Sequence, residues 1–126
     1  MPHTHIALRR GKPPQYRQAI MEQVYAAMRE TFNVPEDDRF MIVTQHDADE
    51  FLYGKHYLGI DRSDDLVLIQ ITANNTRTLE QKKALFAAIA KKLGDNPGLR
   101  PQDVLVNLVE VAKENWSFGL GVAQYA

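Results

Sequence analysis

The chain has 126 residues, of which 44% are hydrophobic and 25% charged, as expected for one soluble domain with a single core. Its formal net charge of -1 favours neither nucleic acid nor an anionic membrane surface as a partner. Because cysteine is absent, disulfides, thiolate nucleophiles and cysteine-ligated metals are excluded. No apolar run is long enough to cross a bilayer or to act as a signal peptide, so we expect a cytoplasmic protein.

The first half of the chain predicts a strand, a helix and a second strand. Residues 3–8 alternate mildly in polarity, as in a strand. Pro13 and Pro14 then open a helix, because proline loses no hydrogen bond at the first helical position. The residues at helical spacing that are expected on its buried face are Tyr16, Ile20, Gln23, Ala27, Met28 and Thr31. Residues 33–35 end the helix, and the β-prone run 40–44 predicts the second strand.

The second half repeats this order. Residues 66–72 form an almost continuous apolar run, which is typical of a central strand covered on both faces. Thr78 and Gln81 fit a capping box at the start of a helix. An apolar stripe then runs toward Gly94, where a helix stop is expected, and comprises Leu85, Phe86, Ile89 and Leu93. Residues 104–111 predict the last strand.

Two successive strand–helix–strand units predict a single domain over residues 1–126, with pseudo-repeats at about 2–48 and 65–112 and a C-terminal segment at 113–126. The expected fold class is α+β: duplicated βαβ units form a four-stranded mixed sheet with two helices on one face. The other face of such a sheet lacks cover. Because the run 66–71 is too apolar to leave one face in water, we expect an oligomer.

Several short motifs follow one another in a distinctive order along this duplicated frame. They are Pro2 after the initiator methionine, Val34-Pro35 with Asp38-Arg39 before the second strand, residues 106–110, and residues 116–119 near the end. With this set of motifs the chain resembles the tautomerase superfamily. The fused two-unit length and the segment 115–121 resemble its malonate semialdehyde decarboxylase group more than the short-chain 4-oxalocrotonate tautomerases.

The resemblance covers nearly the whole chain and implies a homotrimer with sites near the subunit boundaries. It also implies an N-terminal proline at the base of each pocket, a small carbonyl or carboxylate compound as substrate, and no metal or organic cofactor. Within this family Pro2 would be catalytic once Met1 is removed, whereas a small second residue taken alone often has no chemical role.

The chemistry open to Pro2 follows from its α-amino group, whose reference pKa of roughly 7.7–8.0 is close to physiological pH. Modest burial or a nearby cation favours the neutral amine, which is a usable base. The protonated amine can instead donate a proton, and the neutral secondary amine can form an iminium with an aldehyde or ketone. The sequence leaves these three roles open.

The resemblance assigns roles to further residues. Asp38 would bind or activate water and hold the substrate, although a turn carboxylate would suit the same position. The decarboxylase group carries two arginines in the loop after the third strand, and Asn74 and Thr76 stand at those positions here. Both residues can hydrogen-bond a carbonyl or hydroxyl group. The side chain of Arg77, one residue further on, either enters the same pocket or is a solvated side chain just before the helix, and the sequence leaves both alternatives open.

Two aromatic residues and two histidines complete the candidates. Trp116 and Phe118 match a segment that would form an apolar wall beside the proline, or they pack in the core or in a trimer interface. His3 and His5 project from the same side of a strand, but no cysteine or clear carboxylate partner accompanies them. We therefore expect no metal site.

The resulting hypothesis is a cofactor-independent enzyme that uses Pro2 as general base or acid, assisted by Asp38. The reaction would be keto–enol tautomerisation, or a related decarboxylation or hydration, of a small keto acid or semialdehyde oriented by Arg77 or Asn74. A non-catalytic trimeric binding or signalling scaffold of the same fold is the alternative. A ferredoxin-like binding module is a third hypothesis, but the basic stripe or exposed sheet aromatics that it needs are not evident.

Overall fold

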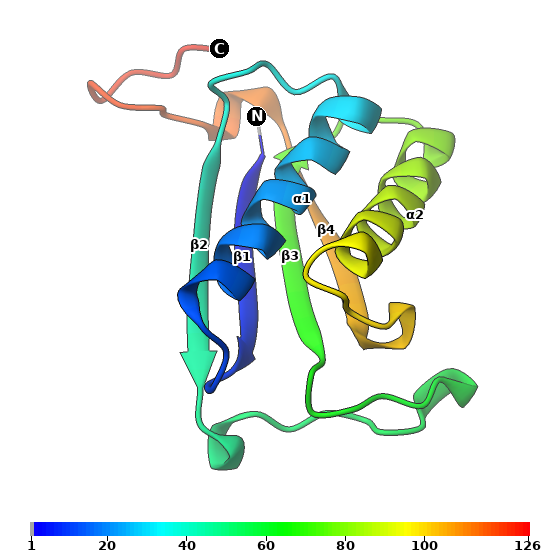
Figure 1. Cartoon of the computed structure of the whole chain (residues 1–126). Helices are drawn as coiled ribbons and strands as arrows, with labels where there is room; N and C mark the ends of the chain where they lie inside the picture. The colour runs from blue at the N-terminus through cyan, green and yellow to red at the C-terminus, as the bar shows by residue number, and fades with distance from the viewer. Residues whose placement is uncertain (1) are drawn as a thin grey trace.

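The computed structural model describes residues 2–126 and shows a four-stranded sheet with two helices packed on one face (Figure 1). The main elements in chain order are β1 (His3–Arg9), α1 (Pro14–Phe32), β2 (Phe40–His46), β3 (Val67–Asn74), α2 (Leu79–Asp95) and β4 (Val104–Val111). Short 3-10 turns are η1 (Ala48–Glu50), η2 (Tyr57–Gly59), η3 (Pro101–Asp103) and η4 (Lys113–Asn115). No helix in the described chain is long and apolar enough to span a membrane.

The strand order is β2-β1-β3-β4. β1 pairs with β2 in parallel and β3 pairs with β4 in parallel, whereas the central pair β1 and β3 is antiparallel. Each parallel pair is joined through one helix, and the two helices contact one another on the same side of the sheet. The predicted α+β fold, a mixed sheet made of two βαβ units, is therefore confirmed.

The helix boundaries follow from their capping residues, with one correction. α1 starts at Pro14 and ends at Phe32, and its C-cap residue Asn33 adopts the left-handed conformation with a φ of 54°. In α2 the predicted capping box is present, because Thr78 and Gln81 each bond the other's backbone N–H. The predicted stop at Gly94 is wrong, since Gly94 lies inside the last turn of α2.

The core lies between the helices and the sheet. Its fully buried side chains include Ile6, Val67, Ile69 and Ile71 from the sheet, Ile20, Val24, Ala27 and Met28 from α1, and Leu85, Ile89 and Leu93 from α2. Burying each of the larger of these side chains contributes roughly 1.5–3 kcal/mol. The predicted stripe on α2 needs one correction, because Phe86 is 38% exposed. Successive helical residues are rotated by about 100°, so the turn that buries Leu85 carries Phe86 away from the sheet.

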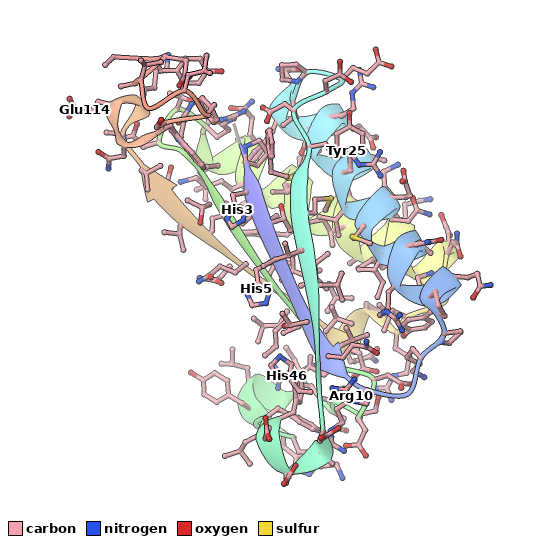
Figure 2. All side chains as sticks on the ribbon, turned by 90° about the vertical axis from the view of Figure 1, so that its left-hand side faces the viewer. His3, His5, Arg10, Tyr25, His46 and Glu114 are labelled. Carbon is pink, nitrogen blue, oxygen red and sulfur yellow. The ribbon has the colours of Figure 1, made fainter. Side chains whose placement is uncertain are left out.

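The sheet face away from the helices is open within the described chain. Its exposed apolar side chains are Phe40, Ile42, Leu105 and Val109. Polar side chains lie between them, and Figure 2 shows His3, His5 and His46 on this face. The prediction of β3 as a central strand is confirmed, but its expected cover on both faces is not found within residues 2–126, because Gln70 is exposed on the open side.

Candidate active site

A cleft of about 460 Å³ opens at the sheet edge where β1 and β2 begin and where β3 and β4 end. In Figure 1 the start of β1 lies at the same edge as the arrowhead of β3. The residues that line the cleft are Phe32, Asn33, Pro35, Asp38, Asn74, Thr76, Arg77, Gln81, Lys113 and Tyr125. The duplicated fold thus gathers residues from loops and from the ends of helices and strands in both halves of the chain into one concave site.

Pro2 is buried immediately before β1. The first residue of β1, His3, pairs with Phe40 of β2 and with Thr72 of β3. Asp38 and Asn74 each lie two residues beyond those partners, toward the cleft. The strand register therefore brings the chain at Pro2 close to the two strand ends that supply Asp38 and Asn74.

Asp38 is the acidic residue of the cleft and is only 5% exposed, whereas its neighbour Asp37 is exposed. Its backbone N–H donates to the carbonyl of Pro35 at 3.1 Å, so the residue belongs to the turn before β2 while its side chain faces the cleft. Burial raises the pKa of the Asp38 carboxyl, and nearby positive charges, Arg77 among them, oppose this effect only in part. Burial in the cleft thus makes ionisation of the Asp38 carboxyl less favourable than it is in water, which is the direction of its raised pKa.

This raised pKa predicts that Asp38→Asn stabilises the fold at neutral pH. A carboxyl whose folded-state pKa lies above its unfolded value of 3.8 destabilises the native state once it is ionised. We expect the variant to unfold about 3 °C higher than the parent at pH 7. The gain should shrink as the pH falls through the folded-state pKa, because the parent carboxyl is then protonated as well.

Thermal unfolding of both proteins at pH 7 and near pH 4 measures this difference. Asp37→Asn is the matched control, since this exposed neighbour should leave the unfolding temperature unchanged at either pH. An Asp38→Asn protein that unfolds at a lower temperature than the parent at pH 7 would contradict the account.

Arg77 is the cation best fixed in the cleft. Its guanidinium donates to the carbonyl of Phe32 at 2.9 Å and lies over the ring of that residue, 4.9 Å from the ring centroid. Burial lowers the pKa of Arg77 and the charge of Asp38 acts in the opposite direction, but a guanidinium stays protonated at neutral pH. The sequence left two positions open for Arg77, in the pocket or in solvent just before the helix, and in the structure Arg77 lines the cleft.

Asn74 and Thr76 also line the cleft, and Asn74 is only 6% exposed. The indole N–H of Trp116 donates to the Asn74 side-chain oxygen at 2.7 Å. Trp116 stacks on Phe118, with ring centroids 5.3 Å apart and an interplanar angle of 14°. Neither aromatic is among the residues that line the cleft, and the aromatic side chain that does so from this segment is Tyr125.

The sequence interpretation missed several lining residues: Phe32, Asn33, Pro35, Gln81, Lys113 and Tyr125. One signal for Lys113 was available, because it follows β4 as Arg77 follows β3, and parallel neighbouring strands end at the same sheet edge. Together Arg77 and Lys113 supply two positive charges against the one carboxylate of Asp38. The cleft is therefore suited to an anionic ligand.

The described residues include no group of three or more histidine, cysteine, aspartate or glutamate side chains that could hold a metal ion. His3 and His5 lie on the open sheet face rather than in the cleft. His5 contacts a hydroxyl, with 2.8 Å between its Nε2 and Thr44 Oγ1.

Comparison with known proteins identifies the family. Two family models, both of the tautomerase enzyme, match residues 38–119 and residues 2–60. The chain belongs to the tautomerase family. It is 40% identical over 124 residues to the probable tautomerase YusQ of Bacillus subtilis (strain 168), and the alignment covers 98% of each chain.

Solved structures agree with this family assignment. A malonate semialdehyde decarboxylase, a protein with decarboxylase and hydratase activities, superimposes with a TM-score of 0.92 at 31% identity, over 98% of this chain and 95% of that one. A second malonate semialdehyde decarboxylase, inhibited by 3-bromopropiolate, gives a TM-score of 0.92 at 36% identity, over 98% and 93% of the two chains. The predicted resemblance is confirmed, and the protein is a tautomerase-family enzyme.

Proposed function

We propose that Pro2, freed by removal of Met1, is the general base and acid in keto–enol tautomerisation of a small 2-keto acid. The observation that carries this proposal is the position of Pro2: it is buried at the start of β1, beside the strand ends that supply Asp38 and Asn74 to an anion-favouring cleft. A secondary amine in that position can take a proton from the carbon next to the carbonyl group and return it.

The charged and polar side chains of the cleft support the other roles in this proposal. The Arg77 guanidinium binds the substrate carboxylate, and Asn74 and Thr76 donate to its carbonyl or enol oxygen. Asp38, close to the proline, stabilises the amine while it carries the extra proton. Tautomerisation returns the proton to the same molecule, so the reaction balances without a co-reactant.

We further propose that the protein works as a homotrimer in which partner subunits cover the open sheet face. The argument is the apolar area on this face, where Phe40 and Ile42 are each 50% exposed. Large apolar side chains left this exposed on one face of a sheet usually mark an interaction site. A closed ring with cyclic symmetry covers the same face of every copy.

A second candidate reaction is decarboxylation or hydration of a small semialdehyde. It is favoured by the TM-score of 0.92 with two malonate semialdehyde decarboxylases and by the nearly buried Asp38, which could hold a water molecule in the cleft. The absence of an arginine at positions 74 and 76 weakens this candidate, because Arg77 then has to bind the carboxylate without a paired arginine.

One pair of assays separates the two reactions. Protein that begins at Pro2 is supplied with phenylenolpyruvate, whose ketonisation is followed by ultraviolet absorbance, and separately with malonate semialdehyde, whose loss of carbon dioxide is measured. We expect rapid ketonisation and slow decarboxylation. The reverse order would favour the second candidate, and rates at the buffer background with both compounds would refute the proposed chemistry.

A further inference from the structure

We propose that Trp116 is a positioning residue: its indole N–H fixes the Asn74 side-chain amide so that the amide nitrogen donates to the substrate oxygen on which negative charge develops. This inference rests on the proposed function, because it assigns the donor that stabilises the enolate in that reaction. The inference also gives two binding tasks to different residues: Asn74 stabilises the enolate oxygen of the substrate, and Arg77 binds its carboxylate.

The orientation of the Asn74 amide follows from the chemistry of its partner. An indole N–H only donates, so the atom that it contacts at 2.7 Å has to be the amide oxygen. If the amide were flipped, its NH₂ group would face the indole N–H of Trp116. Two donors would then meet without an acceptor at Asn74, which is nearly buried. Within residues 2–126 the amide nitrogen has no acceptor, although Asn74 lines the cleft. That nitrogen is therefore the donor presented to a ligand.

Trp116 is itself held in place by the C-terminal segment. Its ring stacks on Phe118, which in turn meets the edge of the Tyr125 ring with 5.2 Å between centroids. The Gln124 side chain accepts from the backbone N–H of Phe118 at 2.9 Å and donates to the carbonyl of Gly119 at 2.9 Å, which closes the segment on itself. The indole can thus hold the amide without being displaced by side-chain rotation.

A fixed neutral donor suits proton transfer next to a carbonyl group. When a proton leaves that carbon, negative charge moves to the oxygen, and a pre-oriented N–H stabilises this charge without reorganising. Donation from Trp116 to the amide oxygen also polarises the amide, which strengthens the hydrogen bond that its nitrogen donates. Phenylalanine at position 116 would keep the ring stack and lose both effects.

A double-mutant cycle in the full-length protein that begins at Pro2 tests the inference. We expect Trp116→Phe to lower kcat for phenylenolpyruvate about 10-fold with little change in KM, because the lost interaction acts on the transition state. The double variant with Asn74→Ala should be no slower than Asn74→Ala alone, because Trp116 acts through Asn74. Val122→Ala, an exposed position in the same segment, is the matched control. Wild-type kcat in Trp116→Phe, or losses that simply add, would overturn the inference.

Two further readouts do not depend on turnover. Trp116 is the only tryptophan, so the indole N–H gives one NMR resonance, and its hydrogen-bonded shift should be lost in Asn74→Ala. Oxalate, a planar analogue of an enolate, should bind about 10-fold more weakly to Trp116→Phe by calorimetry. Protein that binds oxalate in this pattern but does not ketonise the enol would refute the proposed function alone. Oxalate affinity that is unchanged in Trp116→Phe would overturn the inference alone.

Discussion

Replacement of Pro2 by alanine is expected to lower the rate of phenylenolpyruvate ketonisation by about 10²-fold or more. Alanine still presents an α-amino group, but it is a primary amine without the ring that fixes the nitrogen of proline. Pro2 precedes β1 and is not part of the paired strand, so the sheet should form as before. Initial rates by ultraviolet absorbance, with thermal unfolding to check the fold, measure the effect.

The matched control for this variant is Pro14→Ala, an exposed proline at the start of α1 that lies outside the cleft. It should retain the parental rate. A Pro2→Ala protein that is folded and as fast as the parent would exclude the proline as the proton-transfer group. The cleft would then need another base, and Asp38 would be the first residue to test.

Replacement of Arg77 by alanine is expected to lower kcat/KM about 10²-fold, chiefly through a higher KM. A charge-assisted hydrogen bond to a carboxylate is worth about 1.5–3 kcal/mol, which corresponds to roughly 10- to 150-fold in binding. Arg77→Lys should recover only part of the loss, because an ammonium group lacks the planar fork of a guanidinium. It also cannot reproduce both the stacking on Phe32 and the bond to the Phe32 carbonyl.

Steady-state kinetics of the parent, Arg77→Lys and Arg77→Ala test the expected order, in which kcat/KM falls from the parent through Arg77→Lys to Arg77→Ala. Arg10→Ala provides the control, because Arg10 lies near the far end of β1 (Figure 2). It is exposed and pairs with Asp47 on the surface. The control variant should leave kcat and KM unchanged. If Arg77→Ala kept the parental KM and lost only stability, Arg77 would stabilise the fold through its contacts with Phe32 and would not bind the substrate.

Most of the fold could be predicted from the sequence because its signals are local. Pro14 at a helix start and the reciprocal bonds of Thr78 and Gln81 act within one turn of helix, and both lie where the pattern indicated. The error at Gly94 has an equally local cause. Gly98, with a φ of 102°, and Leu99 both donate to the carbonyl of Leu93, so the chain turns after the predicted glycine.

The candidate site could be predicted only in part, because its geometry depends on contacts between distant segments. The resemblance to the family indicated Asp38, Asn74, Thr76 and Arg77, all of which line one cleft. The hydrogen bond between Trp116 and Asn74 joins residues 42 positions apart, and no sequence pattern encodes it. The same holds for Tyr125, which reaches the cleft through the ring contacts of the C-terminal segment.

The central claim, that the free amine of Pro2 moves the proton, is tested most directly on one preparation before and after removal of an N-terminal tag. The tag is cleaved so that the chain begins at Pro2, and phenylenolpyruvate ketonisation is measured on both forms. Before cleavage the nitrogen of Pro2 is an amide without basicity, so we predict a rate at background that rises at least 10²-fold on cleavage. Equal rates before and after cleavage would contradict the claim.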